Sequence, residues 1–192
     1  MATRSFPVTG DPDVDQLLVA DPLALLIGML LDQQVPMEWA FRAPYTLRNR
    51  LGGLDATAIA AMDPVALETV FRDKPALHRY PVAMAKRTHA LCTVIATEYG
   101  GDASRIWTRV RDADVLWNRL RALPGFGEEK ARIFMALLAK RMGKKPVGWE
   151  EIAKPFSDEQ PRSVADIDSR ESFARVRAWK QAQKAMGKGK AD

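Results

Sequence analysis

Apolar residues recur at helical spacing along almost the whole chain, and this pattern predicts a succession of α-helices. Two helices are expected within the first 33 residues, divided at Asp21-Pro22, because an aspartate cap followed by proline is a helix start. The second of them, about 22–33, is apolar on nearly every face, so we expect it in the core. It should end before Pro36, since the residue preceding a proline disfavours the helical conformation.

The same spacing predicts further helices, each bounded by a cap residue, a proline or a glycine. The expected ranges are 37–51, 55–61, 64–72, 81–98, 102–109, 113–122, 128–142 and 169–186. Strand signals are almost absent, so we predict an all-α protein.

After residue 145 the pattern loses its clear period. Residues 146–168 are polar and broken by prolines, yet they hold Trp149 and Phe156, which predicts an irregular loop packed on the core. We therefore divide the chain into a helical core at 1–145, this loop, and a C-terminal helix with a basic tail at 169–192. The last residues, GKGKAD, should be frayed.

The positive charge of the chain is concentrated at its C-terminal end. Seven basic and two acidic residues follow position 169, which accounts for the whole net charge of +5. The basic residues are Arg170, Arg175, Arg177, Lys180, Lys184, Lys188 and Lys190. A basic tail on a neutral body favours a polyanionic partner, although many solvated C-termini look alike.

The cysteine and histidine contents exclude several kinds of site. A single cysteine, Cys92, excludes a disulfide framework and an all-cysteine metal or iron–sulfur cluster. With only two histidines a zinc site is not expected, and we expect neither a metal nor a cofactor. The longest apolar stretch, 23–31, is far short of the roughly 20 residues of a membrane span, and the N-terminus lacks a signal-peptide pattern. We expect a cytoplasmic protein that does not enter a membrane.

One local motif carries chemistry: residues 119–138 read RLRALPGFGEEKARIFMALL. A helix should end at Leu123, and Gly125 and Gly127 should turn the chain with their backbone N–H groups uncovered. Phe126 can tuck inward and hold the turn against the core.

A new helix begins directly after this turn, so its free N–H groups and the positive end of its dipole point outward. Such a helix start binds anions, and a phosphodiester is a suitable anion. Lys130, in the first turn of the helix, can add a positive charge. The alternative interpretation is a plain helix–helix turn without a ligand, because Pro-Gly turns are common.

The string LPGFGEEKA closely resembles the hairpin of helix-hairpin-helix DNA-binding proteins, and its wider context resembles the glycosylase superfamily of endonuclease III, MutY and AlkA. About 90 residues upstream, Gln33-Gln34 at the end of an apolar helix resembles the Gln-Gln of MutY. The resemblance covers roughly residues 20–150. It implies two helical lobes flanking a cleft, without the iron–sulfur cluster of some members.

The resemblance implies a partner and roles for particular residues. The partner is double-stranded DNA, bound by a monomer associated with the nucleoid. The hairpin, with Leu123, Gly125, Phe126 and Gly127, would hold a phosphate through its N–H groups, supported by Lys130. A monovalent cation at the hairpin carbonyls would be consistent with the family.

Upstream of the hairpin, Gln33 or Gln34 would fill the gap left by an extruded nucleotide, unless the pair is only a polar helix end. Four aromatic residues could line a base pocket or belong to the core. They are Trp39, Phe41, Tyr45 and Trp149.

The chain departs from the family at the catalytic acid. Counting from Gly127, the family's valine matches Val147 and its aspartate matches Gly148. Glu150 and Glu151 follow shortly afterwards and could replace it, although a Glu-Glu pair is also typical of a solvated surface. Two later residues, Asp166 and Asp168, are further candidates.

Two other family positions also differ. The lysine of strand-cleaving members corresponds to Glu129, and Lys130 is turned from it by about 100° on the helix, so Schiff-base lyase chemistry is not expected. The catalytic glutamate of MutY corresponds to Met29, and we place Asp32 on another face of that helix.

These features predict a monofunctional DNA glycosylase that hydrolyses the N-glycosidic bond of a damaged base. A weak or displaced carboxylate favours a cationic, alkylated purine, because such a base already carries the charge that activates its departure. Two alternatives remain open: a non-catalytic helix-hairpin-helix protein or damage sensor that has lost the aspartate, and a helical interaction module that does not touch DNA.

Overall fold

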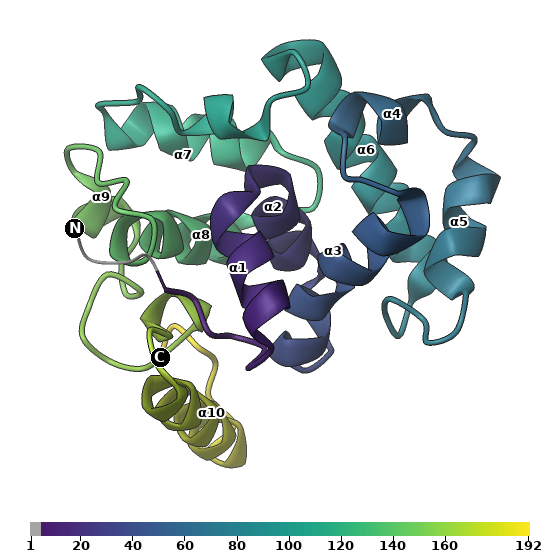
Figure 1. Cartoon of the computed structure of the whole chain (residues 1–192). Helices are drawn as coiled ribbons and strands as arrows, with labels where there is room; N and C mark the ends of the chain where they lie inside the picture. Colours follow the sequence, from purple (N-terminus) through teal and green to yellow (C-terminus); the bar gives the residue numbers. More distant parts are fainter. Residues whose placement is uncertain (1–4) are drawn as a thin grey trace.

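The computed structural model describes residues 5–192, and within them the chain is helical with no β-strand (Figure 1). The helices are α1 Pro12–Ala20, α2 Pro22–Leu31, α3 Met37–Leu51, α4 Ala56–Ala61, α5 Pro64–Arg72, α6 Pro81–Tyr99, α7 Ala113–Ala122, α8 Glu128–Lys140, α9 Trp149–Ile152 and α10 Arg170–Ala185. Two short 3₁₀ helices complete the set, η1 Ala103–Ile106 and η2 Val164–Asp166. An isolated bridge joins Asp112 and Val147. The predicted all-α class is confirmed.

Helix α2 lies at the centre of the molecule (Figure 1). The carboxylate of Asp21 starts it by accepting hydrogen bonds from the N–H groups of Leu23 and Ala24, at 2.8 and 3.2 Å. Every residue from 23 to 31 is buried, as its apolar pattern predicts, and the helix packs against α1, α3, α6 and η1. A Cβ atom at Gly28 would approach the ring of Phe41 to 2.6 Å, so this glycine permits the close contact of α2 with α3.

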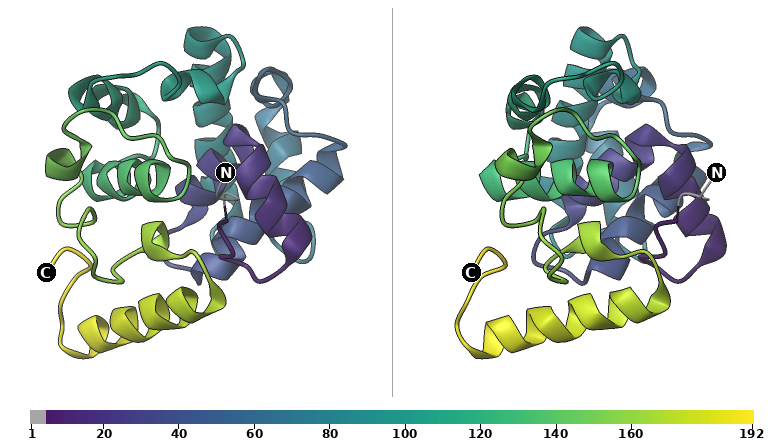
Figure 2. Two further views of the ribbon diagram at one scale, coloured as in Figure 1. Left: turned by 60° about the vertical axis from the view of Figure 1, so that its left-hand side comes forward. Right: turned by 90° about the vertical axis from the view of Figure 1, so that its left-hand side faces the viewer.

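The other helices form groups around α2. Helices α4 and α5 pack against α6, while α9 packs against both α7 and α8, and η2 joins α8 to α10. Helix α10 lies along the edge of the molecule, and the chain after it turns back toward the body (Figure 2). No single helix within residues 5–192 is long and apolar enough to cross a membrane.

Three segments differ from the sequence-based expectations. The helix expected at 102–109 is only the four-residue turn η1, and Arg109 beyond it has a positive φ of 62°. The irregular loop at 146–168 contains α9 and η2, with Trp149 and Phe156 buried as expected. The end expected to be frayed is not helical, and it contacts the body where the Arg162 guanidinium donates hydrogen bonds to the carbonyl oxygens of Lys190 and Asp192, at 3.4 and 2.6 Å.

Candidate nucleic-acid interface

The turn between α7 and α8 is a tight hairpin anchored from inside. The carbonyl of Leu123 accepts a hydrogen bond from the N–H of Phe126, at 3.1 Å. Phe126 is only 3% exposed, and its ring meets that of Phe134 edge-on with centroids 5.7 Å apart. The inward position expected for Phe126 is therefore present, and the backbone on either side of it is left at the surface.

The two glycines of the hairpin serve different purposes. Gly125 has a φ of +80°, and a Cβ atom there would lie 2.4 Å from Cδ1 of Leu30 in α2, so the fold itself requires glycine. Gly127 has an ordinary φ of −67°, and a Cβ atom there would meet nothing within 4 Å. Folding therefore does not require a glycine at 127. Its effect is to leave the backbone at this position accessible from outside.

This open backbone is a donor site. The N–H groups of Gly125 and Gly127 donate to no backbone oxygen within residues 5–192. Helix α8 starts at Glu128, so the positive end of its dipole adds to these donors. The combination can bind one phosphate oxygen pair without any charged side chain.

Lys130 fastens the hairpin to α2. Its Nζ donates hydrogen bonds to the carbonyl oxygens of Met29 and Leu30, both at 2.7 Å. Burial lowers the pKa of Lys130 to about 8, and the nearby Asp32 carboxylate opposes that shift. Lys130 was expected to add a charge beside the phosphate; instead, its ammonium group is turned toward the last turn of α2.

The buried Lys130 makes stability depend on pH. Its pKa is near 8 in the folded chain and near 10.5 in the unfolded one, so the unfolded state holds more protons between these values and stability rises with pH there. We expect wild type to gain roughly 3 kcal/mol over this window relative to Lys130→Met. Urea unfolding at intervals from pH 8 to 10.5 measures this gain in the free energy of unfolding. The control is Lys86→Met, because Lys86 is exposed. Equal pH slopes in wild type and Lys130→Met would contradict the assignment.

The turn after α2 distinguishes the two glutamines. The Gln33 side chain folds back, with Nε2 donating to the Leu30 carbonyl at 2.8 Å and Oε1 accepting from the Arg87 guanidinium at 2.7 Å. Gln34 is exposed and has a positive φ of 56°, which is uncommon for a residue with a side chain. Gln34 is therefore the glutamine that projects from this turn, and the hydrogen bonds of Gln33 stabilise the turn.

Exposed aromatic rings stand beside this turn. Trp39 and Tyr80 are 39% and 43% exposed, and they flank the buried ring of His78 with centroids 6.4 and 6.1 Å from it. The guanidinium of Arg79 lies over the Tyr80 ring at 5.4 Å. Of the four aromatic residues considered from the sequence, Phe41 and Trp149 are buried and Tyr45 is partly buried, so only Trp39 is exposed.

A cavity of about 380 Å³ separates the hairpin from the last turn of α2. Its lining consists of Met29, Asp32, Gln33, Gly125, Gly127, Glu128, Glu129, Lys130, Ile133 and Lys190. Met29 and Asp32 line it together, so the expectation that they occupy different faces is wrong: residues three apart are neighbours on a helix surface.

Three carboxylates line this cavity, and they differ in their partners. Glu128 forms an ion pair with Arg132 at 2.6 Å, and Glu129 lies 3.9 Å from the ammonium of Lys190. Asp32 forms no ion pair or side-chain hydrogen bond within residues 5–192, although its charge raises the pKa values of Lys130 and Lys180 against the effect of burial. Asp32 is thus the carboxylate in this cavity that pairs with no cation in the described part of the chain.

The carboxylates expected after the hairpin lie elsewhere. Glu150 and Glu151 are exposed on α9, where Glu151 pairs with Lys154 at 2.5 Å. Asp168 pairs with Arg141 at 3.2 Å, at the opposite end of α8 from the hairpin. Helix α8 has 13 residues, which corresponds to a length of about 20 Å. None of these three candidates lines the cavity beside Gly127.

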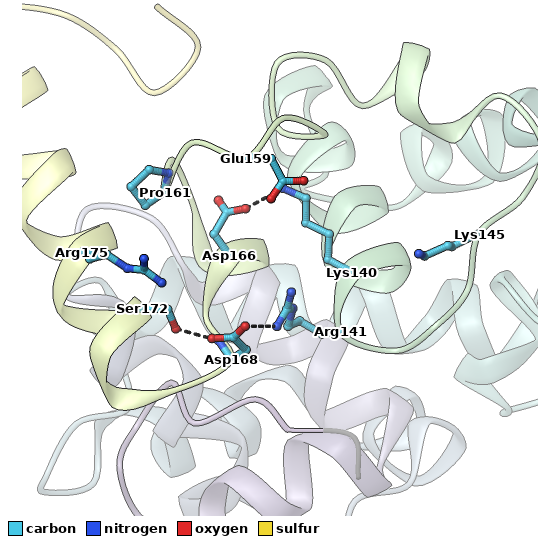
Figure 3. A pocket seen from close by; sticks show the side chains of 9 residues that line it. All are labelled: Lys140, Arg141, Lys145, Glu159, Pro161, Asp166, Asp168, Ser172 and Arg175. Carbon is cyan, nitrogen blue, oxygen red and sulfur yellow. Dashed lines mark hydrogen bonds and ion pairs between the residues drawn. The ribbon is translucent and has the colours of Figure 1, made fainter. Parts of the chain in front are cut away.

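Asp166 and Asp168 line a separate charged cavity, shown in Figure 3. Asp166 pairs with Lys140 at 2.6 Å, and Ser172 and Arg141 both contact Asp168. A hydrogen bond from Ser172 is the main reason why the pKa of Asp168 lies below its ordinary value. These aspartates stabilise the junction of α8 with η2 and α10, and that role explains their position.

The hairpin, the projecting glutamine and the cavity between the hairpin and the end of α2 define a helix-hairpin-helix protein with a DNA-binding surface. The family model of HhH-GPD superfamily base excision DNA repair proteins matches residues 27–189. The chain belongs to this superfamily, and it is a DNA-binding protein of base excision repair. A search of curated proteins finds no match.

Four residues of this surface were missed or given no role by the sequence analysis. His78, Tyr80 and Arg87 come from the loop before α6 and from α6 itself, some 45 to 55 positions after the glutamine turn that they adjoin. Asp32 was noticed and assigned to the wrong face. No local pattern could have identified the first three, because their role arises from the packing of α6 against the end of α2.

Proposed function

We propose that the protein is a monofunctional DNA glycosylase, which hydrolyses the N-glycosidic bond of a damaged base and leaves an abasic site. One observation carries the proposal: the cavity between the hairpin donors and the last turn of α2 contains Asp32, a carboxylate without an ion-pair partner in residues 5–192. A nucleotide turned out of the duplex would enter from the side where both DNA-binding elements meet.

Each part of this surface has a role in that reaction. The N–H groups of Gly125 and Gly127 hold a phosphate of one strand, which fixes the position of the duplex. Gln34 enters the gap left by the extruded nucleotide, and the exposed rings of Trp39 and Tyr80 stack on bases beside it. The extruded sugar then lies near the Asp32 carboxylate.

Asp32 supplies the chemistry. As the bond to the base breaks, the sugar gains the positive charge of an oxocarbenium ion, and a fixed carboxylate stabilises that charge. The same carboxylate can accept a proton from the attacking water. Because Glu128 and Glu129 are engaged with Arg132 and Lys190, the cavity offers little acid to protonate a neutral base. This supports a cationic, alkylated purine as substrate, since it departs without protonation.

Two observations support the absence of lyase activity. Glu129 occupies the position of the family's Schiff-base lysine, and the Nζ of Lys130 is directed at two carbonyl oxygens of α2. A monovalent cation at the hairpin carbonyls stays a prediction, and such an ion would add positive charge near the bound phosphate. Within residues 5–192 no group of three or more acidic, histidine or cysteine side chains could hold a metal ion.

Base release from duplexes that carry single lesions tests the proposal. We expect release of alkylated purines, with the DNA strand left intact until alkali cleaves it at the abasic site. A strand nick without alkali, or an adduct trapped by borohydride that Lys130→Met abolishes, would contradict the monofunctional assignment. The lowered pKa of Lys130 makes this a stringent test, because an uncharged amine is the form that attacks an aldehyde.

A second function, a damage sensor without catalysis, is favoured by Gly148 standing where the family has its aspartate. It predicts tight binding to damaged or abasic duplexes with no base release from any lesion.

A further inference from the structure

The imidazole of His78 joins three backbone groups around the glutamine turn. The N–H of Tyr80 donates to its Nδ1 at 3.0 Å, so Nδ1 carries no proton. In the neutral ring the proton must then be on Nε2, which lies 3.2 Å from the carbonyl oxygen of Leu31 and 3.1 Å from that of Gln33. The ring is 1% exposed, so water does not replace these bonds.

These two carbonyls determine the path of the chain into Gln34. Leu31 is the last residue of α2, and Gln33 directly precedes Gln34, whose φ of 56° is held only while the surroundings fix it. Gln33 and Lys130 fix the preceding carbonyls of Met29 and Leu30. His78 is the residue that reaches the carbonyl next to the strained position.

We propose that His78 is a positioning residue, which holds Gln34 in the outward conformation that engages a gap in DNA, and that protonation of His78 releases this conformation. The inference rests on the proposed role of Gln34 in DNA binding, and it is independent of whether any base is hydrolysed.

The Tyr80 hydrogen bond and the neighbouring charges oppose a doubly protonated ring, whereas the carbonyls of Leu31 and Gln33 favour it. A proton on Nδ1 would face the N–H of Tyr80, so that hydrogen bond would break. The charged groups that act on the ring are both positive, Lys130 from α8 and Arg87 from α6, and its other neighbours are the rings of Trp39 and Tyr80.

The pKa of His78 lies below its ordinary value of 6.5, chiefly because of burial. The neutral ring is therefore favoured in the folded chain. The stabilisation of the folded state by the neutral His78 ring is complete above pH 6.5. It is lost as the pH falls from that value toward the lower pKa of the folded state.

Binding to two duplexes tests the proposal: one contains a tetrahydrofuran analogue of an abasic site, and the other is intact. We expect wild type to prefer the abasic duplex at about pH 7.5 and to lose about tenfold of that preference as the pH is lowered stepwise below 6.5, a change the size of one lost hydrogen bond. His78→Gln places an amide N–H where Nε2 was and cannot titrate, so its preference should persist over the whole pH range. His78→Leu has no donor and should lack the preference throughout.

Three further variants separate positioning from general structure. His89→Gln replaces the other histidine, which also contacts a backbone carbonyl, and should behave as wild type. In a double-mutant cycle, Gln34→Ala should remove the preference alone, and adding His78→Leu should change it no further. Binding to the intact duplex should be unchanged in both variants, because the hairpin supplies it.

Three results would overturn the inference: additive effects of Gln34→Ala and His78→Leu, a His78→Gln protein whose preference falls with pH as in wild type, or equal losses on both duplexes in His78→Leu. No preference for the abasic duplex in wild type would also overturn it, by removing the role of Gln34. A protein that shows the preference and its pH dependence but releases no base would retain this inference and refute the glycosylase proposal.

Discussion

Gly125→Ala will destabilise the protein strongly, whereas Gly127→Ala will leave its stability unchanged and weaken DNA binding. At 125 an alanine meets two penalties, the left-handed φ of +80° and a Cβ atom 2.4 Å from Cδ1 of Leu30. Together these should lower the free energy of unfolding by about 3 kcal/mol. Urea unfolding of the two variants and wild type, monitored by far-ultraviolet circular dichroism, measures the difference.

At 127 the same substitution tests the surface alone. The new methyl group meets no protein atom within 4 Å, so stability should change by less than about 0.5 kcal/mol. The methyl group occupies the space through which a phosphate approaches the uncovered N–H groups, so affinity for duplex DNA should fall about tenfold or more.

The pair of variants provides its own control. Each adds one methyl group to the same turn, two residues apart, and only the variant at 127 should keep the stability of wild type. Unchanged DNA affinity in a stable Gly127→Ala protein would show that DNA does not approach the hairpin from this side. Unchanged stability in Gly125→Ala would show that Leu30 is not in contact with the turn.

The sequence predicted those parts of the molecule whose cause is local. Helix α2 follows from one uninterrupted apolar run and an Asp-Pro start, and the hairpin follows from its proline and two glycines. In these segments the conformation is determined by the residues of the segment itself. The inward position of Phe126 belongs to the same group, since a single apolar residue between two glycines has one direction in which to bury its ring.

Side-chain direction at the interface could not be predicted in the same way. Gln33 and Gln34 are adjacent in sequence, and Arg87 and His78, from a segment packed against α2, help to turn one inward and the other outward. Lys130 stands in the first turn of α8 as expected, yet its ammonium group donates hydrogen bonds to two carbonyls at the end of α2. Such choices depend on contacts between distant segments.

The catalytic carboxylate could not be located by its spacing from the hairpin along the chain. The family position falls on Gly148, and beyond it the segment 146–168 crosses to the far end of α8, where Lys140 and Arg141 pair with Asp166 and Asp168. The later acids are thereby committed to ion pairs away from the hairpin. The available carboxylate, Asp32, lies instead on the other wall of the cavity, at the end of α2.

Asp32→Asn should abolish base release while leaving DNA binding nearly intact. Asparagine has the same size and shape but no negative charge, so it can neither stabilise an oxocarbenium ion nor accept a proton from water. Loss of such a group should reduce the single-turnover rate of base release by at least about 100-fold. The affinity for a tetrahydrofuran-containing duplex should stay within a few-fold of wild type, because the hairpin and Gln34 are unchanged.

The controls for Asp32→Asn are the carboxylates that lie away from the cavity. Glu150→Gln, Glu151→Gln and Asp168→Asn should each release base at close to the wild-type rate, since none of these side chains lines the cavity beside Gly127. Glu129→Gln forms an intermediate case, because Glu129 lines the cavity but faces Lys190 at 3.9 Å. Full activity in Asp32→Asn, together with its loss in Glu150→Gln or Glu151→Gln, would place the chemistry on α9. That result would require α9 to approach the hairpin when DNA binds, and it would overturn the assignment of this cavity as the site of base release.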